Sequence, residues 1–109
     1  MSHRIQRVNA LILRELSTLI QRHLRDPRLT LFVHVTAVDT SADLRHARIH
    51  VSSAEGDAEQ RKMVIIALTS AAGFLRTELA RNVRLRRMPE LSFHWDDSIE
   101  RGDRILKLL

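Results

Sequence analysis

Histidines are the first residues of this 109-residue chain that could perform chemistry, because six of them occur in a short sequence. His46 and His50 lie four residues apart, but they fall in a predicted strand and the zinc-protease motif HExxH is absent. His34, His50 and His94 fall on the polar phase of three predicted strands, so we expect them on one exposed sheet face. No thiolate or carboxylate is spaced to complete a metal site, which favours ordinary surface histidines.

Carboxylates give a second candidate for chemistry. Asp96 and Asp97, with Glu100 and Asp103 nearby, could bind a hard cation, but they lack the spacing of an EF-hand loop and are typical of an acidic turn. Ser52 has no glycine elbow, no glycine-rich phosphate loop is present, and the chain has no cysteine. We therefore expect no enzyme, cofactor or metal, and a metal-dependent nuclease using Asp96 and Asp97 is the weakest alternative.

Positive charge is the strongest local signal. The chain has 18 Lys plus Arg against 13 Asp plus Glu, a formal net charge of +5 that indicates an anionic partner. No aromatic residue is interleaved with the basic run, which favours recognition of RNA shape and backbone over base stacking. If Arg84 and Arg86 lie in an extended segment, both project to one side and can follow a phosphate backbone. We assign RNA binding to Arg76, Arg81, Arg84, Arg86, Arg87, Arg45 and Arg48.

A predicted kink positions this basic run. Apolar residues recur at helical spacing from residue 64 to residue 79, and they continue past Ala71, Ala72 and Gly73. Glycine inside a helix costs about 1 kcal/mol relative to alanine, so we expect a kink at Gly73 between two helical pieces that share one apolar face. The kink then directs the basic run that follows.

The remaining elements follow from periodicity and capping. Residues 5–24 form an amphipathic helix with Ser2 as N-cap and a stop at Asp26-Pro27. Asp57 and Gln60 have the spacing of a capping box at the start of the next helix. The other expected elements are strands at 33–38, 47–53 and 91–95, a hairpin turn at 39–43, an acidic turn at 96–103 and one helical turn at 104–109.

This order, α-β-β-α-kink-α-β, predicts a two-layer α+β fold with a three-stranded sheet and all helices on one face. Residues 1–109 are expected to form a single domain. The polar, basic start of the chain is unlike a signal peptide, and no apolar run reaches the about 20 residues that span a bilayer. We expect a soluble, cytoplasmic protein without a membrane partner.

Several segments, in their order and spacing, resemble the ribosome-binding factor A family across essentially the whole chain. They are Arg4-Ile5-Gln6-Arg7-Val8, Asp26-Pro27-Arg28-Leu29, Val35-Thr36-Ala37-Val38, Ser41-Ala42-Asp43-Leu44, Ala47-Arg48-Ile49-His50-Val51-Ser52, Ala71-Ala72-Gly73-Phe74-Leu75-Arg76, Leu85-Arg86-Arg87-Met88-Pro89-Glu90-Leu91-Ser92-Phe93 and Asp96-Asp97-Ser98. The resemblance implies a KH-like fold of type II, in which the kink at Ala71, Ala72 and Gly73 replaces the Gly-x-x-Gly clamp of ordinary KH domains.

The resemblance also implies a function. The family is non-enzymatic, binds the immature small (30S) ribosomal subunit and its 16S rRNA, and assists late maturation and rRNA processing, notably in the cold. It works alongside assembly GTPases, and we expect a monomer. Many members carry a longer basic tail beyond the position of Leu109. The alternative function is a protein–protein adaptor whose basic face docks an acidic partner.

Overall fold

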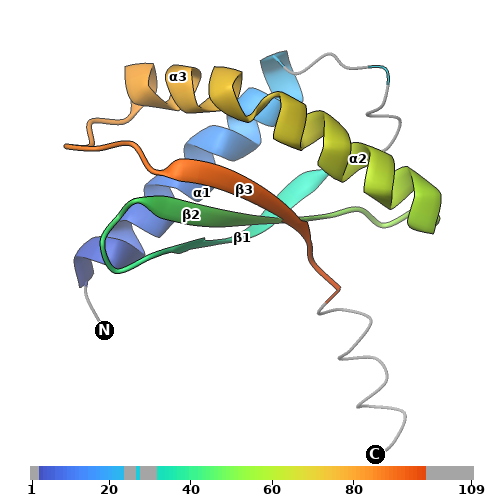
Figure 1. The fold of residues 1–109 in the computed structure, drawn as a ribbon, viewed down its shortest axis with the longest axis horizontal. Coiled ribbons are helices and arrows are strands. Elements are labelled where there is room, and N and C mark those ends of the chain that lie inside the picture. The colour runs from blue at the N-terminus through green and yellow to red at the C-terminus, as the bar shows by residue number, and fades with distance from the viewer. Residues whose placement is uncertain (1–2, 24–26, 28–31, 98–109) are drawn as a thin grey trace, which may run out of the picture.

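The computed structural model describes residues 3–23, 27 and 32–97, and its elements follow the predicted order (Figure 1). They are α1 (His3–His23), β1 (His34–Thr40), β2 (His46–Ser52), α2 (Ala58–Ser70), α3 (Ala72–Asn82) and β3 (Glu90–Trp95). The three predicted strands are confirmed, with bounds shifted by one or two residues. The predicted N-cap Ser2, the stop residue Asp26, the terminal turn 104–109 and residues 98–103 of the acidic turn lie outside the described residues.

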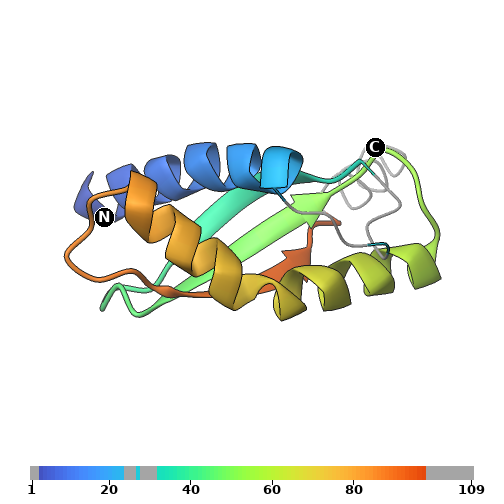
Figure 2. The same ribbon diagram turned by 90° about the horizontal axis from the view of Figure 1, so that it is seen from above.

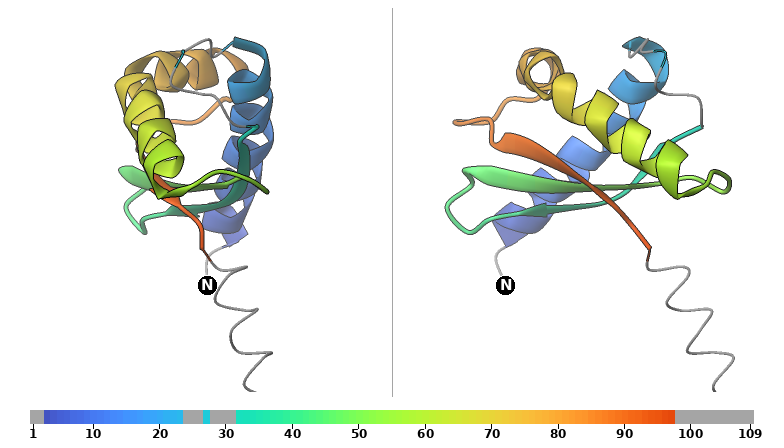
Figure 3. Two further views of the ribbon diagram at one scale, coloured as in Figure 1. Left: turned by 90° about the vertical axis from the view of Figure 1, so that its right-hand side faces the viewer. Right: turned by 45° about the vertical axis from the view of Figure 1, so that its right-hand side comes forward.

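The sheet has the order β1-β2-β3, with β1 antiparallel to β2 and β3 parallel to β2. A bulge interrupts the register of the hairpin between Val35 and Ala37. Figures 2 and 3 show α1 and the α2–α3 pair lying side by side over the same face of this sheet. The two-layer α+β architecture is therefore confirmed, and the described helices leave the other sheet face open.

The core lies between these layers and follows the predicted periodicities. In the central strand β2, Ala47, Ile49 and Val51 are fully buried, while Arg48 between them is exposed. From α1, the side chains of Ile12 and Leu16 are also fully buried. Burying one such side chain stabilises the fold by about 1.5–3 kcal/mol. The buried residues of the sheet and the helices pack together in one hydrophobic core.

The capping box at the start of α2 is confirmed. The Asp57 carboxylate accepts a hydrogen bond from the Gln60 backbone N–H at 2.8 Å, and the Gln60 side-chain oxygen accepts one from the Asp57 N–H at 3.0 Å. Two backbone donors that the helix itself cannot satisfy are thereby paired. This cap fixes where α2 leaves the sheet.

The kink lies within the predicted stretch Ala71, Ala72 and Gly73, but its centre is Ala71, and the expectation that Gly73 causes it is wrong. Helices α2 and α3 meet at Ala71, which has φ −90° and ψ 0°, and their axes are bent by 58°. Gly73 lies inside α3. The bend follows from the bridge-region backbone at Ala71, whose N–H still bonds to the carbonyls of Ala67 and Leu68. Val64 and Leu68 before the kink are buried on the same core as Leu75 and Leu79 after it.

Within the described residues, no single helix is long and apolar enough to cross a membrane. The pair α2 and α3 passes that test of length and composition only when both pieces are counted together across their 58° bend.

Candidate nucleic-acid interface

Residues 83–89, called here the cationic loop, connect α3 to β3. Val83 and Pro89 are buried at its two ends, and Leu85 is half-buried against the core. Arg84, Arg86 and Arg87 are exposed. The Leu85 N–H donates to the Val83 carbonyl at 3.2 Å, so the chain turns at Arg84 instead of running straight. The apolar residues hold the loop on the core and leave its arginines in solvent.

Arg76 fixes the exit of this loop. Its Nη2 donates to the Met88 carbonyl at 2.8 Å, and its Nε lies 3.3 Å from the carbonyl oxygens of both Met88 and Pro89. The rigid fork of a guanidinium suits such a multiple contact, and each hydrogen bond is charge-assisted. Arg76 therefore has a structural role, in addition to supplying a positive charge near the loop.

The arginines of the cationic loop differ from their neighbours in their ion pairs. Arg81 lies 3.8 Å from Glu78, and Arg45 lies 4.0 Å from Asp43. The arginines of the loop are Arg84, Arg86 and Arg87. Among the residues that the structure describes, no carboxylate forms an ion pair with any of them. Their charge is therefore not neutralised by the described part of the protein.

A cavity of about 460 Å³, called here the loop cavity, opens between the cationic loop, the start of α1 and the β1–β2 turn. These three segments lie at one end of the molecule (Figures 1 and 2). The lining residues are Arg4, Val8, Ala42, Asp43, Leu44, Leu85, Arg86, Arg87 and Pro89. The cavity thus combines apolar side chains with three arginines.

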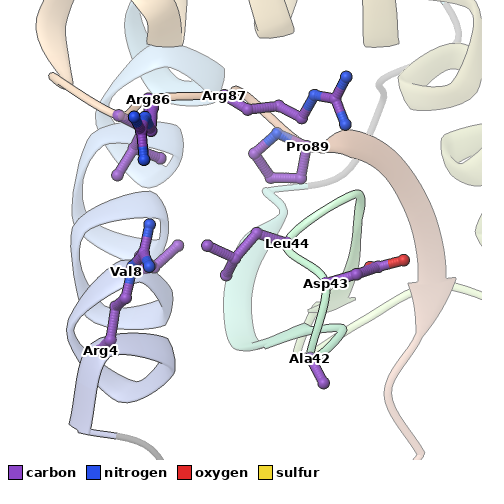
Figure 4. Close-up of a pocket in the computed structure, with 9 residues that line it drawn as sticks. Arg4, Val8, Ala42, Asp43, Leu44, Arg86, Arg87 and Pro89 are labelled. Carbon is purple, nitrogen blue, oxygen red and sulfur yellow. The ribbon is translucent and has the colours of Figure 1, made fainter.

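The β1–β2 turn is held by Asp43. Its Oδ1 accepts hydrogen bonds from the Ser41 hydroxyl at 2.6 Å and from the Arg45 N–H at 3.0 Å. The Ser41 hydroxyl bond, followed by the Arg45 backbone bond, lowers the pKa of Asp43 below its ordinary value of 3.8. The next residue, Leu44, has φ 62°, which is uncommon for a bulky side chain and directs it into the loop cavity (Figure 4).

Two further hollows surround other predicted binding residues. One, of about 370 Å³, is lined by Arg45, Arg76 and Arg87 together with His46, Met88 and Glu90. Another, of about 530 Å³, lies on the open sheet face and includes Arg48 and His94. The structure therefore gathers five of the seven predicted arginines around three hollows. Arg81 and Arg84 line none of these three.

The sequence prediction missed Arg4, which lines the loop cavity with Arg86 although 82 positions separate them in the sequence. The local signal was present, because Arg4 stands four residues before the buried Val8 and therefore on the same side of α1. Nothing in the sequence indicates that this side of α1 faces the cationic loop.

The kink residues leave an open surface. A Cβ added at Gly73 would meet no atom within 4 Å, and the neighbouring Phe74 is 47% exposed. Ala71 and Ala72 are half-buried and pack against the core. The fold therefore does not require glycine at position 73. Because Gly73 has no side chain, another molecule can approach the backbone of the kink closely.

The histidine face and the carboxylates form no metal site in the described part of the chain. The rings of His50 and His94 lie together, with centroids 5.9 Å apart, and Ser92 Oγ lies 3.0 Å from His94 Nε2. Asp96 accepts a hydrogen bond from the Thr36 hydroxyl at 2.6 Å, which engages one of its carboxylate oxygens in the structure.

Comparisons with known proteins agree with this architecture. The sequence model of the family "Ribosome-binding factor A" matches residues 4–109. A ribosome-binding factor A of Dehalococcoides mccartyi is 45% identical over 109 residues, which are all of this chain and 92% of that protein. The crystal structure of ribosome-binding factor A from Thermus thermophilus superposes with a TM-score of 0.69 at 33% identity, covering 83% of this chain and 93% of that one.

A second set of Thermus thermophilus coordinates is a homology model of that protein as fitted into the cryo-EM map of its complex with 30S. It matches with a TM-score of 0.66 at 34% identity, over 82% of this chain and 91% of that one. The three helices and mixed three-stranded sheet are those of these relatives, and the KH-like fold is consistent with them. From the sequence match and the shared fold together, this chain belongs to the ribosome-binding factor A family.

Proposed function

We propose that this protein is a non-enzymatic assembly factor that binds the immature small ribosomal subunit through its 16S rRNA. The observation that carries the proposal is the cationic loop, where Arg84, Arg86 and Arg87 are exposed and have no carboxylate partner within the described residues. Family membership supplies the anionic partner, because the fitted Thermus thermophilus relative is named in a complex with the 30S subunit.

The mode of binding follows from the side chains. Guanidinium groups make two parallel hydrogen bonds to phosphate, so three arginines on one loop can hold a folded RNA backbone. No aromatic side chain lies in the loop, and base stacking on rings is therefore not its main mode. Arg76 keeps the loop in place. Arg45, Arg48 and Arg81 are assigned weaker, supplementary contacts, because Arg45 and Arg81 already lie near carboxylates and Arg48 lies on the open sheet face.

We further propose that this binding assists late maturation of the subunit and processing of its rRNA, including in the cold. No bond is made or broken by the protein; it stabilises one local RNA conformation until the particle is complete. We assign it to the cytoplasm as a monomer, acting alongside assembly GTPases. The support is family membership.

The direct test is co-sedimentation with small subunits purified from cells that lack the protein. Reversing the loop charges, in the variant Arg84→Glu/Arg86→Glu/Arg87→Glu, should abolish association and leave the circular dichroism spectrum unchanged. A matched control changes three exposed arginines of α1 and shifts the net charge equally: Arg7→Glu/Arg14→Glu/Arg22→Glu. The control should retain most binding. Equal binding by the loop variant and the wild type at moderate salt would contradict the proposal.

The same assay distinguishes an rRNA partner from the protein partner of the adaptor alternative. If rRNA is the partner, ribonuclease treatment should release the protein from the particle, and its affinity should fall steeply with salt. A complex that survives ribonuclease and depends little on salt would favour a protein partner. Incubation of labelled rRNA with the protein in magnesium or manganese should give no cleavage, which tests the nuclease alternative.

A further inference from the structure

We propose that the loop cavity holds one unstacked nucleotide of the bound RNA, with its phosphate at Arg4 and Arg86 and its base or ribose on the apolar floor. The inference rests on the proposed function, because it specifies how the same surface would contact RNA. It adds a discrete site, shared by α1, the β1–β2 turn and the cationic loop, to the general attraction between arginines and phosphates.

The first support is the arrangement of charge. In Figure 4 the Arg4 side chain runs along α1 in the direction of Arg86, whereas Arg87 turns the other way over Pro89. Arg4 and Arg86 line the same cavity, and an anion held between two positive groups reduces their mutual repulsion. No carboxylate among the described residues pairs with Arg4 or Arg86. A phosphate is the natural occupant of such a pair.

The acidic residue of the cavity does not compete for these arginines. Asp43 points away from Arg4 and Arg86 (Figure 4), and the Ser41 hydroxyl and Arg45 N–H engage its Oδ1. The Asp43 carboxylate therefore stabilises the β1–β2 turn and does not pair with either arginine. The cavity keeps a positive edge although a carboxylate belongs to its wall.

The second support is the apolar floor. The half-buried Leu85 and Leu44 supply most of its accessible surface, because Val8 is 6% exposed and Pro89 is fully buried. Leu44 extends toward α1 from the turn (Figure 4). Leu44 adopts φ 62° to do so, and strained backbone of this kind often occurs where a ligand is clamped. A volume of about 460 Å³ is within the range of small-molecule pockets.

An anion-binding edge beside an apolar floor matches a nucleotide, which has both a phosphate and a largely apolar base face. RNA-binding proteins commonly recognise bases that leave the stack and lie against side chains, including planar guanidinium groups. Among the described lining residues there is no aromatic ring and no amide side chain, and Arg4 and Arg86 are assigned to the phosphate, so no group is left facing the base edge to select among bases. We therefore expect binding of a nucleotide without preference for its base.

The test uses the full chain and four probes: adenosine monophosphate, uridine monophosphate, adenosine and inorganic phosphate. Two-dimensional NMR titration should show saturable shifts of the Leu44, Leu85 and Arg86 amides with both mononucleotides, at affinities within about threefold of each other. Adenosine and phosphate should each bind at least about tenfold more weakly, because each lacks one half of the contact. Phosphate that binds as tightly as the mononucleotides would overturn the proposal, as would strong preference for one base.

Matched variants locate the site. Arg86→Ala should weaken mononucleotide binding about tenfold, the size of one lost charge-assisted contact, whereas Arg84→Ala on the same loop should change it less than about twofold. Leu44→Gly should also weaken binding, and it should remain folded because glycine adopts positive φ without strain. Equal effects of Arg84→Ala and Arg86→Ala would contradict a discrete cavity.

The same variants distinguish this inference from the proposed function. Leu44→Gly keeps every arginine of the loop, so it should still co-sediment with small subunits but with reduced affinity. If mononucleotides fail to bind while wild-type protein co-sediments, the nucleotide site is wrong and the proposed function stands. If neither mononucleotides nor subunits bind, both are wrong.

Discussion

The cationic loop and the open sheet face both expose basic side chains, but they differ in the acidic residues that lie among those side chains. On the sheet, His46 lies 3.7 Å from Glu90, and Arg48 has Asp39 opposite it in the strand register, so acidic side chains are interspersed with the basic ones although no ion pair joins Arg48 to Asp39. In the loop, Arg86 and its neighbours have no carboxylate partner among the described residues. Exposed positive charge is therefore not equivalent to available positive charge, and we expect the loop to be the better anion-binding surface.

The largest expected effect tests this difference directly. Arg86→Glu/Arg87→Glu should weaken small-subunit binding by more than about tenfold, because two unneutralised charges are reversed. Arg48→Glu on the sheet should weaken binding less than about threefold. Binding constants from filter binding at fixed salt decide the comparison, and a larger effect at Arg48 would reverse it.

The next effect concerns the residue that holds the loop. Arg76→Lys keeps the charge but cannot reproduce the forked contact with the Met88 and Pro89 carbonyls, so the free energy of unfolding should fall by about 1–2 kcal/mol. Urea denaturation measures this change. Arg81→Lys is the control, because its contact is an exposed ion pair worth little. Equal stability of Arg76→Lys and wild type would show that Arg76 does not hold the loop.

A smaller, stabilising effect is expected at the kink. Gly73 is exposed inside α3 with open space around it, so Gly73→Ala should raise the free energy of unfolding by about 0.5–1 kcal/mol. If RNA approaches the kink closely, the same variant should bind subunits more weakly despite its higher melting temperature. A lower melting temperature would contradict a helical backbone with open space at Gly73.

The smallest expected effect concerns Asp43, which stabilises the β1–β2 turn and belongs to neither the cationic loop nor the open sheet face. The Ser41 hydroxyl and the Arg45 N–H lower the pKa of Asp43 in the folded state. Its contribution to stability is therefore present above the ordinary pKa of 3.8 and disappears as the pH falls through the lower, folded value. The stability difference between wild type and Asp43→Ala should shrink as the pH drops below about 4. A difference that grows on acidification would contradict this origin.

The sequence was sufficient for features that depend on local chemistry. The Asp57–Gln60 capping box and the alternation of buried Ile49 with exposed Arg48 follow from spacing alone. The stretch that holds the kink followed as well, but its centre did not, because helix propensity points to Gly73 whereas the bend lies at Ala71. Local preference is a weak guide where two helical pieces must share one core.

The loop cavity could not be predicted, because it depends on contacts between distant segments. Arg4 and Arg86 line one cavity only because α1 packs against α3 and the β1–β2 turn lies at the same end of the molecule. The positive φ of Leu44 is likewise invisible in the sequence, since leucine is a poor candidate for that conformation. The arginines of the loop were identifiable by type, but their lack of partners was not.

The salt dependence of small-subunit binding tests the central claim most directly. Each arginine that contacts an RNA phosphate contributes about 0.7–0.9 to the slope of log affinity against log salt. Replacing Arg84, Arg86 and Arg87 together by alanine should therefore lower the magnitude of that slope by about two to three. An unchanged slope, with affinity reduced or not, would contradict the claim that these arginines bind the rRNA backbone.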